Sequence, residues 1–223
     1  MKGRTDVTIT AATEARRPHR PRADALRNRE RIVTAAREIF VEYGPDAPLD
    51  EIARRAGIGN ATLYRHFADR SALVHAVVVY VMGRVGDMAE RSVTEEGDPF
   101  AALRRFAHAA IDERIGALCP MLSSAFDRTD PTLEAGRTRL EVAVEGLMER
   151  ARRAGRLRTD VAVGDLMVAL SQLTRPLPGT CCLDMDRFAR RHLQLYLDGL
   201  EAPARSELPG SAATLEDLRG AVG

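Results

Sequence analysis

The sequence contains no tryptophan, few other aromatic residues and few cysteines. Phe, Tyr and Trp together make up 4% of its 223 residues, whereas alanine, leucine, valine, arginine and glutamate are frequent. Aromatic side chains favour strands and most of the frequent residues favour helices, so we predict an all-α protein. Cys119, Cys181 and Cys182 are too few for a disulfide framework. The adjacent pair leaves redox sensing as an alternative role.

Long hydrophobic runs and a charged-then-apolar leader are also absent. The longest apolar run, Ala76 to Met82, is far shorter than the roughly 20 residues that a helix needs to cross a bilayer. We therefore expect a soluble, cytoplasmic protein with no membrane partner.

Motifs typical of enzymes and of metal sites are missing as well. There is no Ser-centred elbow, no phosphate-binding glycine loop and no dinucleotide fingerprint. The neighbouring acids Asp112-Glu113 and Glu216-Asp217 are placed by no motif against a base or a metal ligand. The five histidines do not share ligand spacing. We predict that the protein is not an enzyme and has no cofactor and no metal.

The charge is balanced overall but uneven along the chain. The net charge is +1, yet residues 1–80 carry 14 basic and 10 acidic groups, against 19 and 22 in residues 81–223. The basic end is therefore the expected nucleic-acid end. Residues 1–24 lack a hydrophobic period and combine two prolines with several arginines, which predicts a disordered basic arm. Such an arm is either a solvated tail or a segment that follows DNA phosphates.

Residues Leu49 to Phe67 predict two short helices joined by a tight turn. Apolar residues recur at the spacing of one helix face, and acids occupy the first turn, where the helix dipole favours them. Gly57 can adopt the positive φ that ends the first helix, and Leu63 and Phe67 face inward from the second. The outward side chains form a polar set: Thr62, Tyr64, Arg65 and His66. This is helix-turn-helix geometry, whose second helix suits a DNA major groove.

These residues resemble the DNA-binding region of TetR-type transcriptional regulators. The similarity spans roughly Arg29 to Val77 and depends on Ile52, Ala53, Ala56, Gly57, Ile58, Thr62, Leu63, Tyr64, Arg65, His66, Phe67 and Arg70. Two positions depart from the family pattern, because Pro48 and Gly59 replace capping serine or threonine residues. The resemblance implies a DNA-binding domain over residues 25–70 and double-stranded operator DNA as the partner.

By position in the family motif, seven residues would contact DNA. Those expected at phosphates are Thr62, Tyr64, His66 and Arg70, and those expected at base edges are Asn60, Ala61 and Arg65. Tyr64 has an alternative role, which is to pack the turn.

The other apolar patterns predict one helix before this motif and a helical body after it. The first helix covers about Asp24 to Tyr43. The later helices are expected over 70–94, 99–119, 121–126, 131–154, 163–173 and 184–200, and two of them open with an Asp-Pro signal. We predict a helical regulatory and dimerisation domain over residues 71–201 and a disordered tail over residues 202–223.

Helix-turn-helix proteins read palindromic operators as two-fold dimers, so we expect a homodimer. Residues 163–173 are apolar on most sides. They either face a second copy, together with Phe188, Leu195, Tyr196 and Gly199, or are buried within their own subunit.

Several methionine and phenylalanine residues of the body are candidates for lining a cavity that binds an unknown small molecule. They are Phe106, Met121, Phe126, Met148 and Met167, and their alternative role is ordinary core packing. Gly83 and Gly86 interrupt the long fourth helix and either permit close packing or form a hinge. We therefore expect a ligand-responsive repressor released from its operator by a small molecule. The alternatives are a helical protein-protein adaptor without DNA binding and, less favoured, an enzyme.

Overall fold

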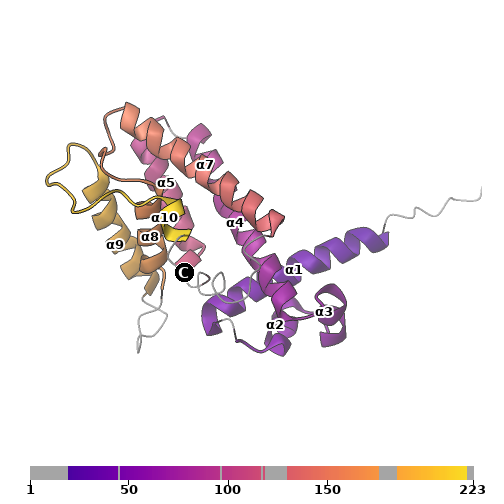
Figure 1. Ribbon diagram of the computed structural model, residues 1–223. Helices are drawn as coiled ribbons and strands as arrows, with labels where there is room; N and C mark the ends of the chain where they lie inside the picture. Colours follow the sequence, from indigo (N-terminus) through magenta and orange to yellow (C-terminus); the bar gives the residue numbers. More distant parts are fainter. Residues whose placement is uncertain are drawn as a thin grey trace, which may run out of the picture.

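The computed structural model describes residues 20–219 except residues 45, 96, 117, 119–129 and 176–184. In that part of the chain the regular secondary structure is helical (Figure 1), apart from one isolated β-bridge. The helices are α1 Arg20–Tyr43, α2 Leu49–Ala56, α3 Asn60–His66, α4 Arg70–Glu95, α5 Pro99–Asp112, α7 Pro131–Arg153, α8 Val163–Leu173, α9 Met185–Leu200 and α10 Leu215–Arg219. The predicted all-α fold with an N-terminal head and a helical body is confirmed.

Some of the residues named from the sequence lie outside the described ones. They are the three cysteines, the candidate cavity residues Met121 and Phe126 with the short helix expected there, and residues 1–19 of the expected arm. Residues 20–24, the end of that arm, belong to α1 instead. Pro21 does not interrupt this helix, because a proline in the first turn lacks only an N–H that has no partner within the helix.

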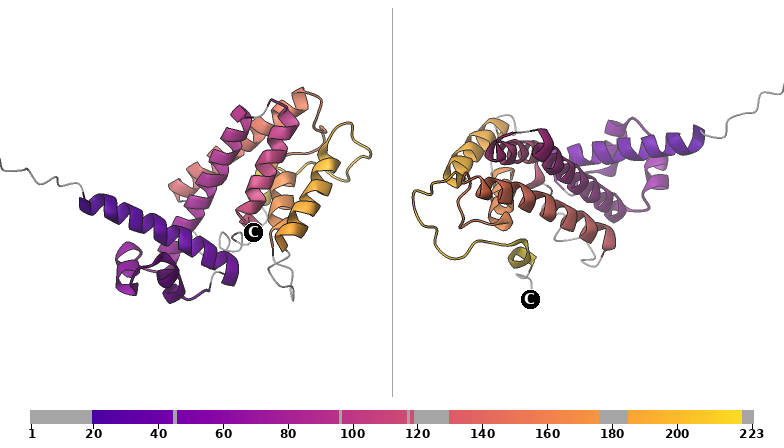
Figure 2. Two further views of the ribbon diagram at one scale, coloured as in Figure 1. Left: turned by 180° about the vertical axis from the view of Figure 1, so that it is seen from behind. Right: turned by 90° about the horizontal axis from the view of Figure 1, so that it is seen from above.

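Helix α4 joins the head to the body. The head consists of α1, α2 and α3, and α4 packs against α1 at one end and against α5 and α7 further along. Helix α5 lies between the α4–α7 pair and the α8–α9 pair (Figures 1 and 2). By length and composition alone α4 could cross a membrane, but half of its most apolar window is buried in the protein. A core helix of a folded domain meets the same criterion, so α4 is explained by its packing.

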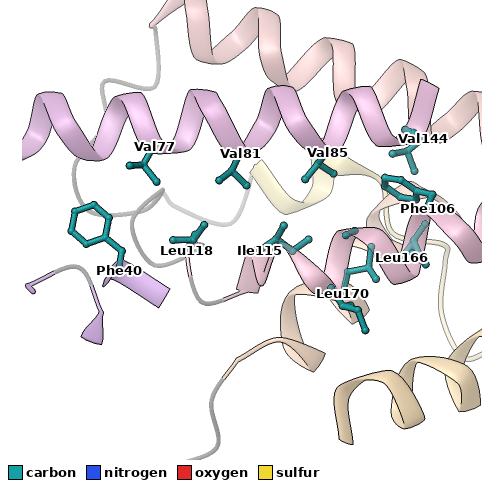
Figure 3. Packing of buried hydrophobic residues seen from close by; sticks show 14 of the residues in the cluster. Phe40, Val77, Val81, Val85, Phe106, Ile115, Leu118, Val144, Leu166 and Leu170 are labelled. Atoms are coloured by element: carbon teal, nitrogen blue, oxygen red, sulfur yellow. The ribbon is translucent and has the colours of Figure 1, made fainter. Parts of the chain in front are cut away.

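One hydrophobic core runs from the head into the body. Phe40 of α1 is 1% exposed and belongs to the same cluster as Val77 and Val81 of α4 and Phe106 of α5. In Figure 3, Leu118 lies between Phe40 and Ile115, on the side of the core that faces Val77 and Val81 of α4. Because these side chains belong to one buried cluster, the head and the body share one packed interior.

Helix α4 is continuous through Gly83 and Gly86. A Cβ atom on Gly83 would have no heavy atom within 4 Å, and one on Gly86 would lie 3.8 Å from the Arg139 side chain. Close packing therefore does not explain either glycine. The hinge stays a prediction.

Helix α5 ends at Asp112 and not near residue 119 as expected. Arg114 has a φ of 52°, and this left-handed residue turns the chain. The turn brings the Gly116 backbone against α8, where its N–H donates to Thr174 Oγ1 at 2.7 Å. A Cβ atom on Gly116 would lie 1.8 Å from the Ser171 carbonyl oxygen, so this crossing requires a glycine.

The structure describes residues 202–219, where the sequence predicts a disordered tail, in contact with the body at several points. Glu201 forms a β-bridge with Leu157, and α10 packs against α8. Leu215 contacts the edge of the core. The loop composition gives no helical period before Leu215, but its backbone groups find partners on α8 and on the turn that precedes it. Asp165 of α8 accepts from the Ala213 N–H at 3.2 Å, and Arg158 of the preceding turn donates to the Ser206 carbonyl oxygen at 2.8 Å.

Candidate nucleic-acid interface

The turn between α2 and α3 has the geometry that the sequence predicts. Gly57 has a φ of 66° and its N–H donates to the carbonyl groups of Ala53 and Arg54, which ends α2. Neither Pro48 nor Gly59, the residues before α2 and α3, supplies a side-chain cap. The helices are held instead by their apolar faces, because Ile52 of α2 and Leu63 of α3 are buried in the head.

Helix α1 contacts the motif at the end of α2 and at Phe67 after α3. Phe67, which directly follows α3, is buried, and the Arg29 guanidinium lies 4.6 Å from the centre of its ring. Arg31 Nη2 donates to the Ala56 carbonyl oxygen at 2.6 Å. Guanidinium groups stack well on aromatic faces, so Arg29 covers one face of the Phe67 ring. Sequence reasoning missed both contacts, since nothing in the motif indicates which arginine of α1 reaches it.

The structure places six of the seven predicted DNA-contact residues on α3 and the seventh, Arg70, at the first position of α4. Ala61, Tyr64 and Arg65 are exposed, and Thr62 and His66 are half-buried. Half of the Tyr64 side chain is open to solvent, so packing the turn is not its main role. The individual contacts to DNA stay predictions.

Two hydrogen bonds arrange polar side chains on this surface. Asn60 Nδ2 donates to Asp50 Oδ1 at 2.7 Å, which ties the start of α3 to α2. Arg65 Nη2 donates to Thr62 Oγ1 at 3.1 Å. A threonine acceptor is neutral, so it orients the guanidinium without cancelling its charge. The sequence predicts an acid in the first turn of α2, but it does not predict that Asp50 accepts a hydrogen bond from Asn60.

The charge of α2 is largely compensated, unlike that of α3. Arg54 Nε donates to Glu51 Oε2 at 2.9 Å, and this hydrogen bond raises the pKa of Arg54. Arg55 lies 3.2 Å from Glu38 and 3.0 Å from Glu42, both on α1. No carboxylate of the described residues forms a salt bridge with Arg65. Its positive charge is therefore available to an anionic partner.

Two arginines around the buried Glu113 connect the head with the body. Glu113, just after α5, is 5% exposed. Its Oε1 accepts from Arg84 Nε and Nη2 at 2.9 and 2.6 Å, and its Oε2 lies 2.8 Å from Arg37 Nη2 of α1. The hydrogen bond raises the pKa of Arg84. The contacts of a buried carboxylate with arginines stabilise the fold only while both partners are present, because the loss of one leaves the other charge uncompensated.

The candidate ligand residues lie in or against the body core. Phe106 of α5 and Met148 of α7 are fully buried, and Met167 of α8 is half-buried against the core. Their role in binding a ligand stays a prediction. Among the described residues no group of three or more His, Cys, Asp or Glu side chains could hold a metal ion.

Two family models match the chain. The model for bacterial regulatory proteins of the tetR family matches residues 32–77, and the model for the C-terminal domain of SbtR-like transcriptional regulators matches residues 98–202. The crystal structure of the TetR transcriptional regulator SCO0520 from Streptomyces coelicolor is 33% identical, with a TM-score of 0.61, and the match covers 79% of this chain and 99% of that one. A TetR regulator from Mycobacterium vanbaalenii is 31% identical, with a TM-score of 0.60 and coverage of 81% and 99%.

A curated relative matches a quarter of the chain. The uncharacterized HTH-type transcriptional regulator TtgW of Pseudomonas putida is 46% identical over 57 residues. These residues are 25% of this chain and 42% of that protein, so the match spans less than half the length of this relative.

Proposed function

The chain belongs to the TetR family of bacterial regulatory proteins, and we propose that it represses transcription as a homodimer that a small molecule releases from a palindromic operator. One observation carries the DNA-binding part of this proposal. Helix α3 buries Leu63 and exposes Tyr64 and Arg65, and in the part of the chain that the structure describes no carboxylate pairs with Arg65. A helix that reads DNA needs both an anchored face and a free, cation-bearing face.

The dimensions of α3 are consistent with a single major groove. Seven residues of helix are about 10 Å long, and the major groove of B-DNA is about 12 Å wide. One such helix reads only a few base pairs, so a specific site needs two heads at a spacing of roughly 34–36 Å. A two-fold dimer therefore predicts an operator with inverted repeats.

The proposed ligand response requires that the body and the head move together. The shared core and the contacts of Glu113 with Arg37 and Arg84 provide that connection. A ligand changes operator affinity only if it binds the DNA-bound and released arrangements differently. The adaptor alternative is less favoured, because an adaptor has no need for the exposed polar groups of α3. An enzyme is also less favoured, because the match to regulators extends through residue 202.

Selection of bound fragments from a random double-stranded DNA library tests the proposal. We expect enrichment of an inverted repeat, with an affinity that falls as salt concentration rises. A reporter gene placed behind the selected site then measures repression. If no sequence is enriched above the random pool, the operator-binding proposal is wrong, and if the reporter is activated, the repressor assignment is wrong.

A further inference from the structure

The turn formed by residues 112–116 lies where the head meets the body. It begins at the last residue of α5 and changes the direction of the chain at Arg114, whose φ is 52°. The Arg114 N–H donates to the Ile111 carbonyl oxygen at 2.9 Å, and Ile115 is buried opposite Val81 of α4 (Figure 3). The turn is therefore held at a defined place in the core, and it can position the helices that contact it.

The α8–α9 pair contacts this turn at both of its ends. The Gly116 N–H donates to Thr174 Oγ1, directly after α8, at 2.7 Å. Arg190 Nη2 of α9 donates to Asp112 Oδ1 at 2.8 Å. The turn is therefore fixed relative to the two helices whose apolar residues are candidates to face a second copy.

Helices α1 and α4 contact the same turn at Glu113. Arg84 of α4 donates to Glu113 Oε1 from both Nε and Nη2, at 2.9 and 2.6 Å. Arg37 Nη2 of α1 lies 2.8 Å from Glu113 Oε2 and donates to the Asp112 carbonyl oxygen at 3.5 Å. One short turn thus connects the first helix of the head with α4, α8 and α9.

The two arginines are not held equally well. Arg84 makes two hydrogen bonds to Glu113, whereas Glu113 Oε2 and Arg37 Nε are buried without a hydrogen-bond partner among the described residues. The contact of Arg37 with Glu113 is therefore an ion pair without an aligned hydrogen bond. Because an unpaired buried polar group costs free energy, the strength of this contact depends on the exact tilt of α1.

We propose that Arg37, through Glu113, sets the spacing of the operator half-sites that the homodimer accepts. The inference rests on the proposed homodimer and adds to it the residue that selects the spacing. The tilt of the head decides how far α3 of one copy lies from α3 of the other. One additional base pair between two half-sites moves them apart by about 3.4 Å and rotates one relative to the other by about 34°. An ion pair that penalises tilting makes this change costly, whereas a head without the ion pair adapts to it.

Operators with altered spacing test the inference on the full chain. The inverted repeat that the parent protein selects is shortened or lengthened by one base pair between its half-sites, and the affinity for each version is measured. We expect each change to cost the parent at least about tenfold in affinity and Arg37→Gln less than about threefold. The matched control is Arg55→Gln, which removes the same charge from the head but breaks only contacts with Glu38 and Glu42 of α1. It should keep the spacing preference of the parent.

A second variant separates a role in spacing from a role in stability alone. Glu113→Asp keeps every charge but shortens the side chain by one methylene group, so the carboxylate cannot keep its contacts with both Arg37 and Arg84. We expect it to accept the altered spacings as Arg37→Gln does. Affinity for a single half-site is the reference, because a variant that only weakens the fold loses affinity for the half-site and for every spacing by the same factor. That result would overturn the inference.

The outcomes also distinguish this inference from the proposed function. If the parent prefers one spacing and both Arg37→Gln and Glu113→Asp keep that preference, the inference is overturned and operator binding stands. If Arg55→Gln relaxes the preference as much as Arg37→Gln, the lost head charge explains the effect and the inference is again overturned. If the parent selects no inverted repeat, the proposed function is overturned and this inference with it.

Discussion

Arg65 is the exposed, charged residue of α3 that we propose contacts a base edge. Its only hydrogen bond among those described is to Thr62, and it is exposed. We predict that Arg65→Ala costs about 1–3 kcal/mol of operator binding and relaxes the preference at one base pair. Tyr64→Phe is the comparison, because loss of a phosphate contact should weaken all sequences alike. Binding of a panel of single-base operator variants measures both effects, and an unchanged panel for Arg65→Ala would rule out direct readout.

Glu113 differs from the surface acids because it is desolvated between two arginines. We predict that Glu113→Gln lowers the free energy of unfolding by about 1–3 kcal/mol, since Arg37 and Arg84 lose their shared counter-charge. Glu90→Gln is the matched control. Glu90 pairs with Arg139, with both side chains about half exposed, so its loss should cost less than about 1 kcal/mol. Urea unfolding measures both, and equal losses would show that burial adds nothing at Glu113.

At the scale of helices, Gly116 allows the segment after α5 to cross α8, because a glycine has no Cβ atom. Gly116→Ala would place a Cβ atom 1.8 Å from the Ser171 carbonyl oxygen, and a backbone atom cannot rotate away. We predict a loss of about 3 kcal/mol or more in unfolding free energy. Gly146→Ala on α7 has open space and should be neutral or stabilising. A thermal midpoint that is the same for both variants would disprove the tight crossing.

Helix α4 offers the opposite case. Gly83→Ala together with Gly86→Ala meets no steric obstacle, so we predict a gain of roughly 1 kcal/mol per site in unfolding free energy from helix propensity. If the glycines form a hinge, operator affinity stays within a few fold and the effect of a saturating ligand on it is reduced. Operator binding measured with and without ligand distinguishes a hinge from glycines that affect only helix stability. The same fold change in parent and double variant would exclude the hinge.

On the scale of the whole molecule, the head shares its hydrophobic core with the body. Phe40 contacts a cluster that continues into the body, so we predict that Phe40→Ala costs roughly 3–5 kcal/mol and shifts unfolding of head and body together. Hydrogen exchange followed by mass spectrometry reports each helix separately. Faster exchange confined to α1, α2 and α3 would show that the body does not depend on the head.

The fold was largely predictable because its signals are local. Asp98-Pro99 and Asp130-Pro131 mark helix starts by adjacent residues, and Asp98 and Asp130 do cap α5 and α7. The end of α5 was not predictable, because it depends on the close approach of Gly116 to α8, far away in the sequence. The path of residues 203–214 was not predictable for the same reason, since Arg158 and Asp165 become their partners only after folding.

The candidate nucleic-acid interface was also predictable only in part. The helix-turn-helix spacing gave α2, its turn and the outward residues of α3, because helical periodicity fixes which side chains share a face. It could not give the tie between Asn60 and Asp50 or the stacking of Arg29 on Phe67, which depend on how the helices cross. The side chains that α3 exposes were therefore predictable as a set, whereas those that orient the set were not.

The contact of Arg37 with Glu113 also sets a rule for engineering. Synthetic biologists build new sensors by joining the DNA-reading half of one regulator to the effector-binding half of another. A splice within α4 would take Arg37 from one parent and Glu113 from the other. Unless the second parent has an acid at this position, the chimera would bury an arginine without its counter-ion. The choice of parents should therefore be made at residues 37, 84 and 113 before the splice point is chosen.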